Sequence, residues 1–246
     1  MAHRQVASRA LRGSRPRLAF SILFLVLAAA AASAQPLAGE KAREAWQRVP
    51  DVASAMQVRA GAIVADIGAG YGFLTVRLAP IVGSAGKVYA VDSGEDALRN
   101  LRRRVTDEHL DNVIVVDGDA HDPHLPARAL DAAVIINAYH EFAFFDDMLA
   151  HISEALKPGG RLVIAEPVPQ KPGQTRAEQA TAHVIEPDLV VADLTRAGFA
   201  IVQRDDRFVK RPDSAGEYYY SLVVGERRAV QQLRALNRIS PGAHGG

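Results

Sequence analysis

Short apolar runs alternate with amphipathic stretches along the middle of the chain. The runs are rich in Val, Ile and Ala and are apolar on both faces, as in strands buried within a parallel sheet. They cover Ala62–Ile67, Lys87–Val91, Val113–Val116, Ala132–Ile136 and Arg161–Ala165. The intervening and following stretches have helical spacing and cover Gly72–Pro80, Gly94–Thr106, Phe142–Leu156 and Pro187–Ala197. This alternation predicts an α/β fold with a doubly wound, largely parallel sheet.

The pattern changes towards both ends of this region. Lys157–Gly160, with the sequence Lys-Pro-Gly-Gly, is a strong stop before the fifth predicted strand. Further on, no helix separates the strand candidates Phe199–Gln203 and Tyr218–Val224, so we expect them to pair antiparallel. Lys41–Val58 carries helix start and stop signals, and Arg227–Asn237 is a candidate helix in the tail.

The first 34 residues differ in charge from the rest of the chain. They hold five arginines and no acid, whereas the remaining residues hold 24 basic and 28 acidic side chains, a net charge of −4. An apolar run from Leu18 to Ala32 follows the arginines, and Ala32-Ser33-Ala34 has the small residues of a cleavage site. These features predict a signal peptide cleaved after Ala34 and an exported protein, periplasmic or secreted. The alternative is an uncleaved membrane anchor over residues 18–39, because about 20 residues span a bilayer.

We therefore divide the chain into a signal peptide or anchor (1–34), a helical lead-in (35–60), the main domain (61–226) and a tail (227–246). The chain contains no cysteine, which excludes disulfides, a thiolate nucleophile and Cys-ligated zinc. Its mildly acidic body argues against nucleic acid as a partner, because such binding depends on neutralising phosphates.

A glycine loop follows the first predicted strand and opens the first predicted helix. Its residues Gly68, Gly70 and Gly72 allow the backbone to approach a ligand closely, beside the N–H groups of a helix N-terminus. The dinucleotide-binding fingerprint needs a third glycine at the position of Phe73, which disfavours NAD as the cofactor.

Acidic residues lie at or just beyond the ends of the first three predicted strands. Asp66 precedes the glycine loop, and Asp92 lies about 20 residues beyond the loop, where a carboxylate can accept both hydroxyls of a ribose. Asp119, within Gly118-Asp119-Ala120, could help to bind an adenine. Each residue alone suits a turn or a helix cap. Together they lie at the sheet edge where open α/β sheets bind ligands, and they favour a nucleotide-like cofactor.

These motifs together resemble the class I S-adenosylmethionine-dependent methyltransferases, over about residues 40–225. Val64–Gly72 resembles the first motif of that family, Val88–Asp92 its acidic second motif, and Gly118–Ala120 its adenine-contacting segment. Leu156–Leu162 resembles the motif before the fifth strand. The resemblance implies a seven-stranded mixed sheet of order 3-2-1-4-5-7-6, with strand 7 antiparallel, in a three-layer Rossmann-like sandwich.

The resemblance also implies S-adenosylmethionine as the cofactor. Asp66 and the glycine loop would face its methionine part, Asp92 its ribose, and Asp119 its adenine. Asn137 follows the fourth predicted strand at the same sheet edge and is a further expected contact. The full set of expected cofactor contacts is Asp66, Gly68, Ala69, Gly70, Gly72, Asp92, Asp119, Ala120 and Asn137.

The loop after the fourth predicted strand is where we look for catalytic residues. Methyl transfer from a sulfonium needs alignment above all, and a general base only where the acceptor is protonated. His140 is a candidate base or acceptor contact, with Glu141 orienting it; alternatively, both residues simply begin the helix at Phe142, where an acid suits the helix dipole. Ala138 and Tyr139 replace the prolines of the Asn-Pro-Pro-Tyr motif, which argues against an exocyclic amine as acceptor.

Other histidines have less specific surroundings. Imidazoles and carboxylates bind zinc, so one acidic and histidine-rich loop could suggest a metal site: Asp119, His121, Asp122 and His124. Because Pro123 breaks this loop and Asp119 is assigned to adenine, we expect a solvated loop and no metal. His183 precedes the helix near Pro187, and we expect a loop or cap role for it, with the acceptor pocket as the alternative.

The sequence thus predicts a methyltransferase acting on an unidentified small-molecule acceptor. The segment between Pro167 and Glu186 and the segment before the glycine loop are both short, which leaves no separate substrate domain. The alternative is an exported, non-catalytic cofactor-binding or scaffold protein of the same fold. The export signal favours that alternative, because S-adenosylmethionine is made and held in the cytosol.

Overall fold

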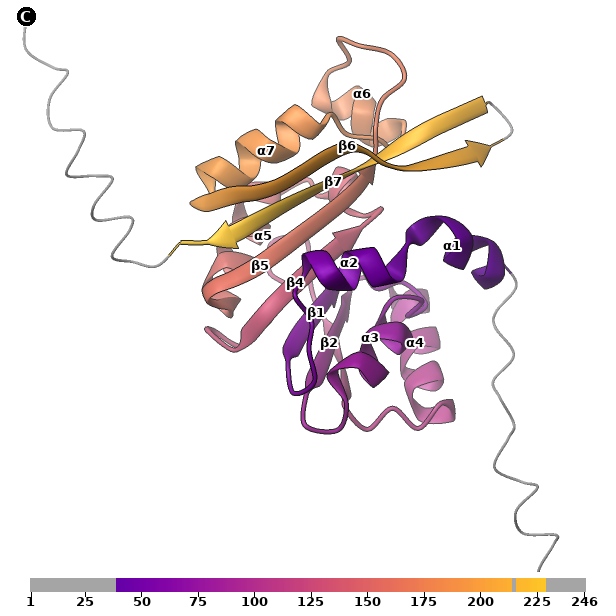
Figure 1. Cartoon of the computed structure of the whole chain (residues 1–246), viewed down its shortest axis with the longest axis vertical. Helices are drawn as coiled ribbons and strands as arrows, with labels where there is room; N and C mark the ends of the chain where they lie inside the picture. Colours follow the sequence, from indigo (N-terminus) through magenta and orange to yellow (C-terminus); the bar gives the residue numbers. More distant parts are fainter. Residues whose placement is uncertain (1–38, 214–215, 229–246) are drawn as a thin grey trace, which may run out of the picture. The chain divides into compact units, whose positions relative to one another are not determined.

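The computed structural model describes residues 39–213 and 216–228 (Figure 1). The expected signal peptide, residues 1–34, and the tail from residue 229 onward lie outside these ranges. Within the described ranges, no helix combines the length and the apolar character needed to cross a bilayer.

Seven strands form one mixed sheet in the order β3-β2-β1-β4-β5-β7-β6. The strands are β1 (Ile63–Ile67), β2 (Lys87–Asp92), β3 (Val113–Asp117), β4 (Leu130–Ile136), β5 (Leu156–Pro167), β6 (Phe199–Asp213) and β7 (Gly216–Arg227). Strands β1 to β5 pair in parallel, and β7 is antiparallel to both of its neighbours. The predicted strand order and the antiparallel last pair are confirmed. Because β1 to β5 are parallel, their carboxyl ends meet at one edge.

Helices cover both faces of this sheet. One face packs against α2 (Val49–Ala55), α3 (Thr75–Val82) and α4 (Glu95–Asp107), and the other against α5 (Phe145–Ala155) and α7 (Pro187–Arg196). In Figure 1, α2 crosses in front of the sheet. Successive residues of β1 point to opposite faces of the sheet. Val64 packs in the hydrophobic core under α2, α3 and α4, and Ala65 packs in the core under α5 and α7. The predicted three-layer sandwich is confirmed.

The last two strands are longer than the apolar pattern predicts. That pattern predicts strands over Phe199–Gln203 and Tyr218–Val224, whereas β6 and β7 form a long hairpin that continues past the end of β5 (Figure 1). The added part of β6 is mostly charged, with Phe208 and Val209 packed on the first hydrophobic core, so it has no alternating apolar pattern that would predict a strand. Arg227, predicted to begin a tail helix, is the last residue of β7.

The segment between β4 and β5 also differs from the prediction. Tyr139–Glu141 forms a 3-10 turn and Phe142 has extended backbone, so α5 begins at Phe145 rather than at Phe142. Strand β5 begins at Leu156, and Lys157–Gly160 lies inside it, where the register with β4 shifts. The short turn keeps His140 at the carboxyl edge of the sheet, outside any α-helix.

Two further short helices lie near that edge. α1 (Glu40–Gln47) contacts β6, and α6 (Arg176–Thr181) contacts the Tyr139–Glu141 turn. α6 was not predicted, although its start has a sequence signal. The Thr175 hydroxyl accepts from the Glu178 N–H at 3.3 Å, and the Glu178 carboxylate accepts from the Thr175 N–H at 2.7 Å. This reciprocal capping box begins a helix in an otherwise polar segment.

Candidate functional site

The carboxyl edge of the sheet holds a cavity of about 270 Å³. Its polar wall comes from the ends of β1 to β4 and includes Gly68, Gly70, Asp92, Gly118, Asp119 and Asn137. Its apolar wall includes Ile67, Val91, Phe142 and Met148. Five of the nine residues expected to contact a cofactor therefore meet at one cavity, together with Glu141; the five are Gly68, Gly70, Asp92, Asp119 and Asn137.

The glycine loop has a shape that larger residues would not adopt. Gly68 has φ +74°, and a Cβ atom there would lie 2.5 Å from the Cβ of Ala138. The N–H groups of Gly68 and Ala69 both donate to the Val91 carbonyl, at 2.9 Å each, which fixes the loop over the end of β2. Gly72 likewise has φ +79°, and a Cβ atom there would lie 2.7 Å from Leu101 Cδ1.

Asp92 is held by backbone on both of its carboxylate oxygens. Oδ2 accepts from the Gly70 N–H at 2.8 Å, and Oδ1 accepts from the Gly94 N–H at 2.9 Å. A carboxylate offers about four lone-pair positions, so each oxygen keeps capacity for another donor. The side chain lines the cavity with a fixed orientation, and this arrangement fits two adjacent ribose hydroxyls.

Asp119 lies beside it and is likewise ordered by backbone donors. Its Oδ1 accepts from the N–H groups of His121 and Asp122, at 2.8 Å each. These bonds lower the pKa of the exposed Asp119 carboxyl below its ordinary value, so it stays a charged acceptor. Ala120 is exposed and is not part of the cavity wall.

Asp66 lies behind the loop, outside the walls of the described cavities. It is 3 % exposed, and its Oδ2 accepts from the Thr75 hydroxyl at 2.6 Å. Burial raises the pKa of Asp66 to about 6, although the Thr75 hydrogen bond acts in the opposite direction. In this position Asp66 ties β1 to the start of α3 and supports the loop from beneath.

A second cavity, of about 320 Å³, lies on the other side of the glycine loop. Gly68, Ala69, Gly70 and Asn137 line it from the sheet, and Arg43, Trp46 and Arg211 line it from α1 and β6. Arg211 lies over the Trp46 ring at 4.5 Å from its centroid. The three side chains from α1 and β6 were not predicted, because no local pattern links α1 to the far end of β6.

A third cavity, of about 400 Å³, lies beyond the end of β5. Asn137, Val168, Lys171, His183 and Tyr218 are among its walls. His183 lies in the turn after α6, as expected of a loop residue, and it also faces this pocket.

Asn137 is the residue that all three cavities share. It has φ +57°, and its Oδ1 accepts from the Tyr220 hydroxyl at 2.8 Å. Tyr220 is in turn tilted against Trp46, with ring centroids 4.9 Å apart. The amide is therefore held in place at the point where the three spaces meet.

His140 is oriented by a carboxylate that sequence reasoning missed. Its Nδ1 lies 2.6 Å from Glu166 Oε2, and both side chains are fully buried. The other oxygen, Oε1, accepts from the N–H groups of Ala138 and Tyr139 at 2.8 Å each. Burial lowers the pKa of His140, but the hydrogen bond and charge of Glu166, together with Glu141, outweigh it and raise the pKa above its ordinary value.

Glu166 could have been found by the rule that found the acids of β1 and β2. It is an acid at the carboxyl end of a parallel apolar strand. The apolar pattern ends this strand at Ala165, two residues too early, and so leaves Glu166 in the following loop. Glu141, expected to orient His140, instead lies on its other side, with Oε1 3.6 Å from His140 Nε2.

The acidic and histidine-rich loop after β3 makes contacts of its own. His121 Nδ1 lies 2.7 Å from an Asp147 carboxylate oxygen, and the His121 ring stacks on Phe144. His124 Nδ1 lies 2.7 Å from the Asp117 carbonyl oxygen.

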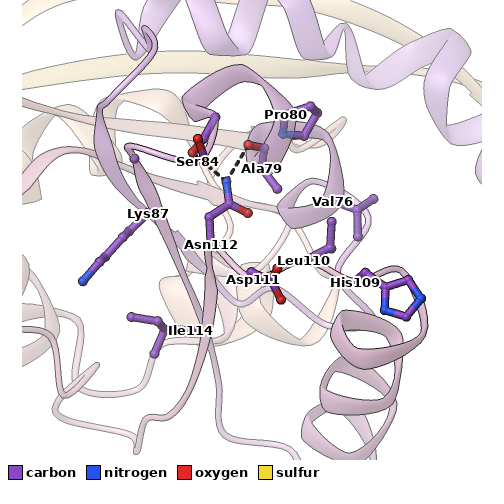
Figure 2. A pocket seen from close by; sticks show the side chains of 12 residues that line it. Val76, Ala79, Pro80, Ser84, Lys87, His109, Leu110, Asp111, Asn112 and Ile114 are labelled. Atoms are coloured by element: carbon purple, nitrogen blue, oxygen red, sulfur yellow. Dashed lines mark hydrogen bonds between the residues drawn. The ribbon is translucent and has the colours of Figure 1, made fainter.

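A larger cavity, of about 620 Å³, lies at the opposite, amino edge of the sheet (Figure 2). Asn112 is fixed by backbone in its wall, because its amide nitrogen donates to the carbonyls of Ala79 and Gly83 at 2.8 and 2.9 Å. Lys87, His109 and Asp111 at its walls are exposed to solvent. None of the residues expected to bind a cofactor lies there.

Known methyltransferases resemble this chain in sequence and in fold. A family described as a methyltransferase domain matches residues 64–160. A probable cobalt-precorrin-6B C(15)-methyltransferase of Sulfurisphaera tokodaii is 28% identical over 153 residues, which are 61% of this chain and 78% of that protein. The ubiquinone/menaquinone biosynthesis C-methyltransferase of Pseudomonas fluorescens is 36% identical over 110 residues, 44% of this chain and 43% of that protein. The chain thus spans less than half of the latter.

A solved structure supports the same fold. The S-adenosylmethionine-dependent methyltransferase of Aquifex aeolicus matches with a TM-score of 0.60 and 23% identity, covering 73% of this chain and 89% of that one. The chain therefore contains a methyltransferase domain over residues 64–160 and has the fold of the class I S-adenosylmethionine-dependent methyltransferases. The comparisons leave its methyl acceptor unidentified, and none of them favours a non-catalytic scaffold.

Proposed function

We propose that this protein transfers a methyl group from S-adenosylmethionine to a small-molecule acceptor bound beyond β5. The observation that carries the proposal is the position of Asn137, which borders the cavity at Asp92, the cavity at Arg43 and the cavity at His183. A cofactor lying along the first two would bring its methyl group to the wall of the third.

In this proposal the cofactor's adenosine lies in the cavity of Asp92 and Asp119. Asp92 accepts the ribose hydroxyls, and Gly118 and Asp119 border the adenine. The glycine loop, supported by Asp66, adjoins the methionine part. Arg43 would pair with the methionine carboxylate, because this half-buried cation lines the cavity beside the glycine loop.

The size of the third cavity supports a small acceptor. About 400 Å³ is within the range of small-molecule pockets, about 300–1,000 Å³. The mildly acidic body also argues against RNA or DNA, for which a basic stripe is the usual footprint. Lys171 in the wall of this cavity would favour an acceptor that carries negative charge.

The reaction itself is an in-line displacement. A lone pair of the acceptor forms a bond to the methyl carbon while the carbon–sulfur bond breaks, and that electron pair stays on sulfur. The acceptor's proton must leave. We assign this proton to His140, whose Nδ1 is held as the donor by Glu166 and whose Nε2 faces Glu141 and His183.

Calorimetric titration of the full chain with S-adenosylmethionine and S-adenosylhomocysteine tests the cofactor step. We expect micromolar binding of both, and loss of binding in Asp92→Ala. A tritium-transfer screen of small anionic nucleophiles then tests the acceptor step. A folded wild-type protein that binds neither cofactor form would overturn the proposal.

We further propose that the chain is exported and cleaved after Ala34. The arginines before Leu18–Ala32 and the Ala32-Ser33-Ala34 site support this. Intact-mass analysis of the protein from a periplasmic extract should give a chain beginning at Gln35. A full-length mass in the membrane fraction would instead support an anchor over residues 18–39.

A further inference from the structure

Three potential ligand atoms form a small triangle between the cofactor cavity and the acceptor cavity. His140 Nε2 lies 3.2 Å from His183 Nδ1 and 3.6 Å from Glu141 Oε1. The third side, from His183 Nδ1 to Glu141 Oε1, is 3.5 Å. Among the described residues, this is the group of His and acidic side chains whose ligand atoms converge closely enough to share one metal ion.

The three distances are closer to the ligand–ligand distances around one metal ion than to hydrogen-bond lengths. Ligands about 2.0–2.1 Å from a tetrahedral zinc ion are about 3.3 Å apart. A hydrogen bond explains the His140–His183 distance of 3.2 Å, but the two distances to Glu141 exceed the ordinary hydrogen-bond range. A carboxylate oxygen nearly equidistant from two imidazole nitrogens is the arrangement around a common ion.

The surroundings of His140 also suit a metal ligand. Its Nδ1 lies 2.6 Å from the buried Glu166 carboxylate, which is itself fixed by two backbone N–H groups. A metal-binding imidazole usually donates its other N–H to such a carboxylate, which sets the tautomer and makes the coordinating nitrogen more basic. Glu166 therefore prepares Nε2 to coordinate.

We propose that His140, Glu141 and His183 bind a divalent transition-metal ion such as Zn²⁺. Two imidazoles and one carboxylate are a common ligand set for a catalytic ion with an open position. The carboxylates of Glu141 and Glu166 supply negative charge to balance the ion. The side chains of Glu141 and His183 are 61% and 70% exposed, so an ion can reach the site from solvent.

The open position of this ion would lie where the acceptor meets the cofactor. Glu141 lines the cofactor cavity and His183 lines the acceptor cavity. Resting on the proposed methyl transfer, the ion would bind the acceptor's oxygen or nitrogen and lower its pKa, so that its proton leaves to water. The freed lone pair then attacks the methyl carbon. With the ion bound, His140 is a ligand, and the acceptor loses its proton to water rather than to His140.

The test is a Zn²⁺ titration of the full chain, purified without a histidine tag, in competition with a chromogenic chelator. We expect one tight Zn²⁺ per wild-type chain. Glu141→Gln and His183→Asn should each weaken Zn²⁺ binding at least 10-fold. Both residues are largely exposed, and Asn tolerates the φ of +54° at His183, so both variants should fold.

His109→Asn is the matched control. His109 is also exposed and has φ +52°, but it lies at the amino-edge cavity. Its replacement should leave Zn²⁺ affinity unchanged. Equal Zn²⁺ affinity in wild type, Glu141→Gln and His183→Asn would overturn the proposal, as would a wild type without tight Zn²⁺.

A separate cofactor titration distinguishes this inference from the proposed function. Wild-type protein stripped with a chelator should still bind S-adenosylhomocysteine, because the cofactor contacts are other residues. Cofactor binding without tight Zn²⁺ leaves the methyltransferase proposal standing and rejects the metal site. Tight Zn²⁺ at this triangle without cofactor binding supports the metal site and rejects the methyl transfer.

Discussion

The two edges of the sheet each carry a cavity, and they differ in what is buried around it. At the carboxyl edge, Asp66, His140 and Glu166 are ionisable groups at or below 5 % exposure. At the amino edge the cavity is larger, yet its ionisable residues are exposed and Asn112 is bonded to two backbone carbonyls. Volume alone would select the amino edge, where none of the expected cofactor contacts lies.

The difference follows from the free-energy cost of burying charge. A buried ionisable group lowers stability unless partners compensate for it, so such groups concentrate where they serve chemistry. The amino-edge cavity has no such group in its wall among the described residues. We therefore expect substitutions at the carboxyl edge to change binding, and substitutions at the amino edge to change stability alone.

The largest expected effect is on cofactor affinity. Asp92→Ala removes two ribose hydrogen bonds to a carboxylate, each contributing about 1.5–3 kcal/mol. We expect S-adenosylhomocysteine to bind at least about 100-fold more weakly, as measured by calorimetry. Asp111→Ala, an acid at the amino edge, should bind it as the wild type does.

Because Asp92 also holds Gly70 and Gly94, the loop itself could respond to its removal. Asp92→Asn retains one acceptor oxygen and provides a second comparison. Unchanged affinity in both Asp92 variants, with both folded by circular dichroism, would remove the carboxyl edge as the ribose site.

The next effect compares two glycines with positive φ. Gly68→Ala combines a left-handed backbone with a Cβ 2.5 Å from Ala138 Cβ, whereas Gly61→Ala, at the amino edge with φ +78°, meets nothing within 4 Å. We expect Gly68→Ala to lower the free energy of unfolding by about 3 kcal/mol and Gly61→Ala by about 1 kcal/mol. Urea denaturation measures both. An equal loss of unfolding free energy in the two variants would mean that the backbone around Gly68 and Ala138 can move apart without an energetic cost.

This contrast between the edges was partly visible in the sequence. The alternating apolar runs predict the parallel strands. Because parallel strands end at the same edge of the sheet, the strand ends also predict which loops lie together. Gly68, Asp92 and Asn137 meet at one cavity for this reason. These predictions depend on periodicities within single elements. Two features were less predictable. Lys157–Gly160 lies inside β5 where the register with β4 shifts, and an irregular register leaves no periodic pattern. The outer part of β6 is mostly charged, so it also lacks an alternating apolar pattern.

The contacts between distant elements could not be predicted from local patterns. Arg43 and Arg211 are 168 positions apart and meet only because α1 contacts β6. His140 and His183 converge because α6 places a turn beside the end of β4. His121 and His124 suggest a metal site in the sequence because they are neighbours in the chain, whereas the ligand atoms that converge come from separate loops.

The third effect is a pH dependence of stability that arises at the carboxyl edge. Burial raises the pKa of Asp66 to about 6 from an ordinary 3.8, so the folded state holds this proton more tightly than the unfolded state. The stabilisation from the protonated form is complete below about pH 4 and is lost as the pH rises through 6. The shift corresponds to about 2–3 kcal/mol.

Asp66→Asn cannot ionise, and its amide oxygen can still accept from Thr75. We expect its stability relative to wild type to rise by about 2 kcal/mol between pH 4 and pH 7, measured by urea denaturation at each pH. Asp111→Asn, exposed at the amino edge, should follow the wild-type curve. Parallel curves for Asp66→Asn and wild type would show that Asp66 does not ionise in this interval.

The smallest effect tests the amino edge itself. Asn112→Ala removes the bonds to the Ala79 and Gly83 carbonyls, which join the end of α3 to the start of β3 (Figure 2). Water entering the open cavity can replace part of both bonds, so we expect a loss of about 1 kcal/mol in the free energy of unfolding. Affinity for S-adenosylhomocysteine should stay within twofold of wild type. A 10-fold weaker affinity at unchanged fold would mean that α3 transmits changes from the amino edge to the glycine loop, and the two edges would then act as one site.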